Sequence, residues 1–450
     1  MSLLVAPWAI GQGALPEVDD PVIHYNSSEG LTDPVTQLQR DMAAGTRHLK
    51  FESKRGYLSS LLKTLHVPVS SQTLVFSKTS SQKEQTSPRT PRAVYFSSDV
   101  YVGWAPGCPV IDLASVDSKR GAVFYTLEQT ANTSPTLKRQ FDCLSCHDTA
   151  RTLQVPGFFV RSVHTGPDGT PLATVRGFES GHGSSLDQRW AGWYVSGTHI
   201  SAKVLSQGLV PGKGEGELHL GNVISSDRDH PEKVDARLGA NLRDLRSHFD
   251  APLYLSPQSD IVALLVLEHQ VRMHNLLTRA SYEAQYALAE LAGKGKELGD
   301  VENLNVDSPW PQQRIAQAGE RLLEYMLFRD EAPLKGPVKG TSSFAAEFQR
   351  IGPRASGGRS LRQLDLKTRL FRYPCSFLIY SSSFDGLPRE MKNYVWRRLD
   401  QILKGDDWGG DSLVPAPDQT CASMSAEDRR AVRDILIETK PEFATFTRQQ

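Results

Sequence analysis

The period of the hydrophobic pattern changes twice along this chain of 450 residues, and that change constrains the fold more than any other feature. Up to about residue 66 and again beyond residue 256, apolar residues recur every three to four positions, as on one face of a helix. From Ala93 to about Gly221 they alternate or form short runs between Gly, Pro and Asp, which is typical of strands. The order helix, strand, helix predicts an α+β protein.

The length exceeds what one compact core usually contains, so we expect more than one domain. We divide the chain into a helical or irregular N-terminal segment (1–90), a β-rich central region (91–255) and a helical C-terminal region (256–450). The predicted helices span 33–42, 56–66, 260–292, 311–328, 389–403 and 425–438. The predicted strands span 94–96, 100–104, 110–113, 123–127 and 190–195, with a hairpin formed by 158–164 and 172–178.

Charge and hydropathy argue against nucleic acid as the main partner and against a membrane-spanning segment. The 51 basic and 51 acidic residues cancel, whereas proteins that bind nucleic acid show a basic excess. The longest apolar run, Ile261–Leu267, is far shorter than the roughly 20 residues of a membrane-spanning helix. Met1–Ala14 is apolar but has no basic residue, so it is read either as the tail of an export signal or as a plain N-terminal arm.

A short motif carries the chemistry. Cys143, Cys146 and His147 form the pattern C-x-x-C-H, which random placement of five Cys and 12 His would give on the order of 0.0015 times per chain. Two thiols three positions apart can each bond to one vinyl group of a haem, and the imidazole that follows can donate a nitrogen to the iron. The motif therefore predicts one covalently attached haem c, with His147 as the proximal iron ligand.

Two other interpretations of the motif are weaker. A zinc site would need further Cys or His partners at similar spacing, and the sequence has no second C-x-x-C. A thioredoxin-like redox pair belongs between a strand and a helix of a parallel βαβ unit, which the pattern does not indicate.

On Cys143, Cys146 and His147 the chain resembles the c-type cytochromes. The phrases at 102–104 (VGW) and 373–375 (YPC) also resemble a group of large exported bacterial cytochrome c-like proteins. This resemblance implies a periplasmic or otherwise exported location and a redox role, and it supplies no substrate. The chain departs from small cytochromes c, because no Met lies between Met42 and Met273 and strands are expected after His147. We therefore expect an unusual haem region, not the small all-α fold.

The second axial position of the iron is expected to be open or filled by a His. The helix over 260–292 offers Glu268, His269, Met273 and His274, and we name His274 as the candidate distal ligand because its strip of the helix is more apolar. His269 and His274 diverge by roughly 140° around the helix, so both cannot reach one iron. Further candidates are His164, His182 and His199. The alternative is that these imidazoles are hydrogen-bonded core residues.

Two residue groups remain open in function. The basic side chains between 354 and 372 face one acid over that span, and they form a solvated basic face or else contact haem propionates or a redox partner. These are Arg354, Arg359, Arg362, Lys367, Arg369 and Arg372. The thiols Cys108, Cys375 and Cys421 are odd in number, which allows one disulfide and one buried thiol in an oxidising compartment.

The favoured function is an exported mono-haem c-type redox protein that acts as a haem-dependent oxidoreductase. A bare electron carrier needs only about 80 to 100 residues, so the size of this chain favours catalysis. The alternatives are an electron-transfer subunit that docks a redox partner and a haem-based sensor or binding protein. The expected partner is a redox protein or a small-molecule substrate.

Overall fold

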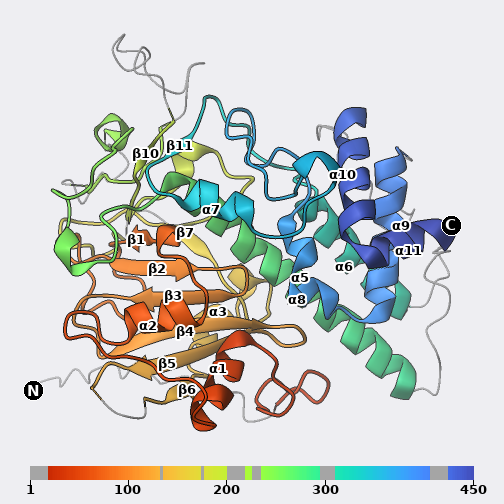
Figure 1. Cartoon of the computed structure of the whole chain (residues 1–450), viewed down its shortest axis with the longest axis horizontal. Coiled ribbons are helices and arrows are strands. Elements are labelled where there is room, and N and C mark those ends of the chain that lie inside the picture. Colours follow the sequence, from red (N-terminus) through yellow and green to blue (C-terminus); the bar gives the residue numbers. More distant parts are fainter. Residues whose placement is uncertain are drawn as a thin grey trace, which may run out of the picture.

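The computed structural model describes residues 19–131, 135–173, 177–199, 218–225, 235–293, 310–405 and 424–449. It contains an antiparallel sheet on one side of a long central helix, α5 (Ile261–Gly293), and a group of helices on the other side (Figure 1). The α+β expectation is confirmed, and the fold is not a small all-α one. Met1–Ala14 and Cys421 lie outside the described residues.

The sheet has seven strands in the order β6-β5-β4-β3-β2-β1-β9, and every named pair in it is antiparallel. Five of these strands were predicted: β3 has the expected bounds, β2, β4 and β5 are longer than expected, and β9 is shorter. β1 and β6 were not foreseen. The bounds are β1 (Thr73–Val75), β2 (Arg92–Phe96), β3 (Val100–Trp104), β4 (Val110–Asp117), β5 (Gly121–Glu128), β6 (Leu137–Arg139) and β9 (Trp193–Tyr194).

Both faces of the sheet are buried, because alternate residues of each strand enter two different cores. One row of cross-strand neighbours packs toward α5: Phe96, Tyr101, Ala114 and Phe124. The next row packs toward α1 (Pro34–Ala43) and α2 (Leu58–Thr64): Tyr95, Val102, Leu113 and Tyr125. Residues before 91 thus share a sheet and a core with the central region, although the division at residue 90 stays a prediction.

Helix α5 is the axis of the molecule. Its 33 residues are buried along most of their length, and its first turn is held by Asp260, whose carboxylate accepts the N–H groups of Val262 and Ala263. The other helices are α3 (Leu144–His147), α6 (Trp310–Met326), α7 (Phe344–Arg350), α8 (Ser382–Asp385), α9 (Arg389–Lys404), α10 (Ala426–Thr439) and α11 (Pro441–Gln449). Within the described ranges, none of the helices is long and apolar enough to cross a membrane.

The helices α3, α7, α8 and α11 were not predicted, because each is short or lacks a clear apolar stripe. The expected hairpin is present in reduced form: β7 (Val160–Ser162) pairs with β8 (Phe178–Ser180) over three residues each. Two further strands, β10 (Gly197–Thr198) and β11 (Lys339–Gly340), link the central and C-terminal regions.

Tertiary contacts account for some of the basic residues between 354 and 372 and for two of the three remaining thiols. Arg369 pairs with Asp428 at 2.7 Å and Arg359 pairs with Glu438 at 3.3 Å, so the acids of α10 neutralise part of the basic run. Arg362 is buried over the rings of Phe348 and Phe377. Cys108 and Cys375 are buried free thiols in different core clusters.

Candidate haem-attachment site

The motif forms a single helical turn, α3, in which the N–H of His147 donates to the carbonyl of Cys143 at 2.9 Å. Phe141 and Leu144 attach this turn to a small apolar cluster that consists of Ile23, Tyr25, Val155 and Tyr282. Cys143 is partly buried and Cys146 is exposed, and both are free thiols. The turn is therefore anchored on one side, while the thiol of Cys146 stays exposed on the other.

His147 is held twice by one glycine. Its Nδ1 lies 2.8 Å from the carbonyl oxygen of Gly157, and the N–H of Gly157 donates to the carbonyl of His147 at 2.9 Å. Because a carbonyl can only accept, Nδ1 must carry the proton and Nε2 must carry the lone pair. Burial lowers the pKa of His147, which keeps the imidazole neutral. The described residues supply no hydrogen-bond partner to Nε2, so this atom can act as a metal ligand.

The glycine that orients His147 is itself positioned by α5. Asn275 accepts the N–H of Phe158 at 2.8 Å and donates to the carbonyl of Phe158 at 2.7 Å. A Cβ added to Gly157 would lie 2.3 Å from Oδ1 of Asn275, so no larger residue fits without a shift. Sequence reasoning missed both Gly157 and Asn275. Only the Pro156-Gly157 turn signal pointed to this segment.

Two aromatic rings flank the imidazole of His147. Phe159 stacks on it with the ring centroids 5.0 Å apart, and Phe124 lies at the same distance at a steeper angle. Burial raises the pKa of the Cys143 thiol to about 11, with Asp112 and Asp142 acting in the same direction. Catalytic redox thiols have a lowered pKa instead. A raised thiol pKa beside an antiparallel sheet argues against a thioredoxin-like pair.

The residues present fit a covalently attached haem. The fit rests on the donor set: two free thiols on one turn, followed by a neutral imidazole whose Nδ1 is committed and whose Nε2 is not. Across the described ranges, no group of three or more His, Cys, Asp or Glu side chains converges as a closed metal site would require. A haem needs only one or two ligands from the chain.

His274, the candidate distal ligand, lies in the core between α5 and the sheet. Its Nδ1 is 2.9 Å from the hydroxyl of Tyr101, and its Nε2 is buried with no hydrogen-bond partner. Its ring contacts are Tyr101 and Phe158, whereas those of His147 are Phe124 and Phe159. The structure thus gives the two imidazoles different ring neighbours, and ligation of iron by His274 stays a prediction. Met273 is fully buried in the same core.

His269 and His182 are hydrogen-bonded core residues. Their Nδ1 atoms lie 3.0 Å apart, and Nε2 of His269 lies 2.8 Å from the hydroxyl of Ser376. Beside them Glu268 is paired with Arg189 at 2.8 Å, and the two side chains are 0% and 3% exposed. Both ring nitrogens of His269 are therefore in use.

The two remaining candidates lie elsewhere. His199 is buried beside the ring of His219, and the half-buried His164 precedes the turn between β7 and β8.

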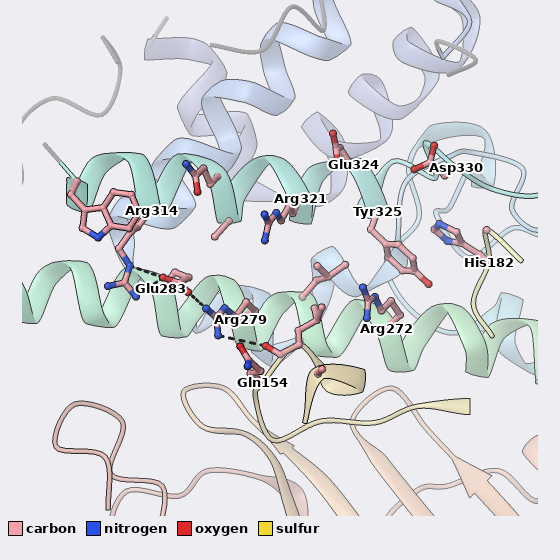
Figure 2. Close-up of a pocket in the computed structure, with 17 residues that line it drawn as sticks. Gln154, His182, Arg272, Arg279, Glu283, Arg314, Arg321, Glu324, Tyr325 and Asp330 are labelled. Atoms are coloured by element: carbon pink, nitrogen blue, oxygen red, sulfur yellow. Dashed lines mark hydrogen bonds and ion pairs between the residues drawn. The ribbon is translucent and has the colours of Figure 1, made fainter. Parts of the chain in front are cut away.

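A groove of about 1080 Å³ adjoins the segment that follows the motif. Residues from 150 to 154 form part of its wall, and α5 and α6 form its long sides (Figure 2). Cys143, Cys146 and His147 do not line it. The groove is thus separate from the attachment turn but begins three residues after it in the chain.

Comparison with known proteins gave no match to any family model, curated protein or solved structure.

Proposed function

We propose that this chain is an exported mono-haem c-type redox protein. The observation that carries the proposal is the geometry of His147, whose Nδ1 is fixed by Gly157 and whose Nε2 is left uncommitted one residue after the second thiol. Cys143 and Cys146 would form the two thioether bonds, and His147 would be the proximal ligand. Export follows from the resemblance to c-type cytochromes.

Haem c, when bound, supplies a one-electron couple whose potential depends on its axial ligands and surroundings. The residues of the chain set the conditions for that couple. Gly157 fixes the tautomer and orientation of His147, which raises the basicity of Nε2. Phe124 and Phe159 exclude water from the flanks of the imidazole. Asn275 holds the segment that carries the accepting carbonyl.

The function favoured within this class is that of an oxidoreductase. The groove supports it, since a groove of about 1080 Å³, which includes residues that follow the motif, is large enough for a small-molecule substrate. A second candidate is an electron-transfer subunit. The exposure of Cys146 favours that role, because a haem edge attached there would lie at the surface, where a redox partner can reach it.

The decisive experiment is maturation of the chain in a periplasm with cytochrome c assembly, followed by denaturing gel electrophoresis and intact mass. We expect the mass of one haem to survive denaturation and to be lost in the Cys143→Ser, Cys146→Ser double variant. Cys108→Ser and Cys375→Ser, at the two buried thiols, are the controls and should retain the haem. A matured wild-type chain without covalent haem would refute the proposal.

The spectrum of the same preparation separates the two candidate roles. His147→Ala should change the Soret band while the haem stays attached. A low-spin iron that becomes high-spin in His274→Ala alone would identify the distal ligand and favour electron transfer. A wild-type iron that binds carbon monoxide or cyanide readily would favour chemistry at an open site. A sulfur-to-iron charge-transfer band that is lost in Met273→Ala would contradict the expectation that the ligand is not Met.

A further inference from the structure

The groove between α5 and α6 is rich in arginine. Arg272 and Arg279 reach it from α5, and Arg314 and Arg321 reach it from α6 (Figure 2). Leu276 and Ala318 add apolar surface on the two facing helices. At one end, the rings of His182 and Tyr325 stack with their centroids 3.8 Å apart. The chamber therefore offers positive charge together with flat apolar surface.

Three carboxylates also line the groove: Glu283 lies at the end away from His182, whereas Glu324 and Asp330 lie near Tyr325 and His182 (Figure 2). Glu283 pairs with Arg279 and, at 2.6 Å, with Arg314, so one carboxylate serves two guanidinium groups. Glu324 pairs with Arg329, which is not a lining residue. Around Glu283, two guanidinium groups face one carboxylate, so the local charge at that end is positive.

Arg272 and Arg321 have no ion-pair partner among the residues that the structure describes. Arg272 is half-buried, and burial lowers the pKa of its guanidinium. A cation that is withdrawn from water without a counter-ion is unfavourable unless an anion compensates it. Figure 2 shows Arg321 extending from α6 toward α5, the helix that carries Arg272. Arg272, which is half-buried, and Arg321, which is exposed, thus line one groove from its two facing helices.

We propose that this groove binds a small organic acid through carboxylate or phosphate groups held by Arg272 and Arg321. The planar guanidinium groups suit such oxyanions, since each can donate two parallel hydrogen bonds. Leu276 and Ala318 contact the carbon skeleton of the ligand, and the stacked rings of His182 and Tyr325 close one end. The inference does not depend on the presence of haem.

The test is calorimetric titration of the purified full-length chain at low ionic strength in a buffer without phosphate. Succinate and inorganic phosphate are the probes, and they distinguish a carboxylate site from a phosphate site. We expect saturable binding of at least one probe, weakened by added salt. Arg272→Gln and Arg321→Gln should each weaken it about tenfold or more. Arg321→Lys, which keeps the charge, should weaken it less. Arg47→Gln, at an exposed arginine after α1, is the control and should leave affinity unchanged.

Thermal unfolding supplies a second readout that a folding defect would not imitate. The bound probe should raise the Tm of the wild-type chain by mass action and should leave the Tm of Arg272→Gln unchanged. Equal affinity in the wild type and in both glutamine variants would overturn the proposal. So would binding of polyglutamate without binding of either small probe, since that result would indicate an acidic protein partner. Neither outcome would bear on covalent haem attachment at Cys143 and Cys146.

Discussion

Two histidines in different regions of the molecule show what separates a candidate ligand from a core residue. His147 belongs to the short turn α3 and commits one ring nitrogen to a carbonyl. His269 belongs to the buried helix α5 and commits both, one to His182 and one to Ser376. Both imidazoles lie among aromatic rings, and burial lowers the pKa of both. The number of uncommitted nitrogens distinguishes them, and this number depends on partners distant in sequence.

The same contrast applies to the regions around them. The motif turn is attached through Phe141 and Leu144 and leaves Cys146 exposed. The cluster on α5 surrounds a fully buried ion pair between Glu268 and Arg189. We therefore expect substitutions in the α5 cluster to affect stability and substitutions at the motif to affect chemistry.

The largest expected effect on stability comes from breaking the buried ion pair. Glu268→Gln leaves the guanidinium of Arg189 buried without a counter-charge, which should lower the free energy of unfolding by about 3–5 kcal/mol. Urea-induced unfolding monitored by circular dichroism measures this change. Ser145→Ala, in the exposed part of the motif, is the matched control and should cost less than about 0.5 kcal/mol.

A double variant sharpens that result. Glu268→Gln combined with Arg189→Met removes both charges, so it should recover part of the stability that the single variant loses. A single variant that costs less than about 1 kcal/mol would contradict the view that this pair is structurally essential.

A smaller effect is expected where the two regions meet. Asn275→Ala leaves the N–H and the carbonyl of Phe158 buried without partners, which should cost about 1–3 kcal/mol. Because Asn275 also positions the segment of Gly157, the variant should shift the Soret band of the matured protein. The shift separates a positioning role from a purely structural one, since the latter predicts lower stability with an unchanged spectrum.

The third effect is a change in acid sensitivity. Burial lowers the pKa of His274 to about 3, below its ordinary value of 6.5. The unfolded chain therefore binds a proton there that the folded chain does not, so stability decreases as the pH falls from about 6.5 toward 3. In His274→Phe this contribution is absent. Between pH 6.5 and 3, the slope of the free energy of unfolding against pH should therefore be smaller than in the wild type by about 1.4 kcal/mol per pH unit.

Two carboxyl groups act in the opposite direction over part of this range. Burial raises the pKa of Asp99 to about 6 and that of Glu331 to about 7, so the folded state binds more protons at these sites. The wild-type chain and His274→Phe both contain these groups. The difference between their plots of unfolding free energy against pH therefore isolates His274. His48→Gln, at an exposed imidazole, is the control. An unchanged slope in His274→Phe would show that this His is protonated in the folded chain.

Local signals predicted several elements well. The predicted helix over 425–438 corresponds to α10, whose start Ser425 caps: its hydroxyl accepts the N–H of Asp428 at 3.0 Å. Pro34 after Asp33 predicted the start of α1, where the carboxylate of Asp33 accepts two N–H groups. Such elements depend on neighbours within one helical turn, and sequence reasoning sees these directly.

Long-range pairing was beyond local reasoning. The strand β1 has three buried residues and no alternation, and it exists because it pairs with β2 on one side and β9 on the other. The basic run from 354 to 372 looked unneutralised because its acids, among them Asp428 and Glu438, come from α10.

The sequence by itself determined the motif of Cys143, Cys146 and His147, the α+β class and the position of the long helix α5. These depend on covalent spacing and on local periodicity. Only the tertiary structure decided the state of each imidazole and the presence of the arginine groove. Gly157 lies ten residues after His147, and Asn275 lies 128 residues after it. Gly157 and Asn275 together nevertheless fix the tautomer of His147. A hydrogen bond depends on distance in space, and chain spacing does not specify that distance until the fold is complete.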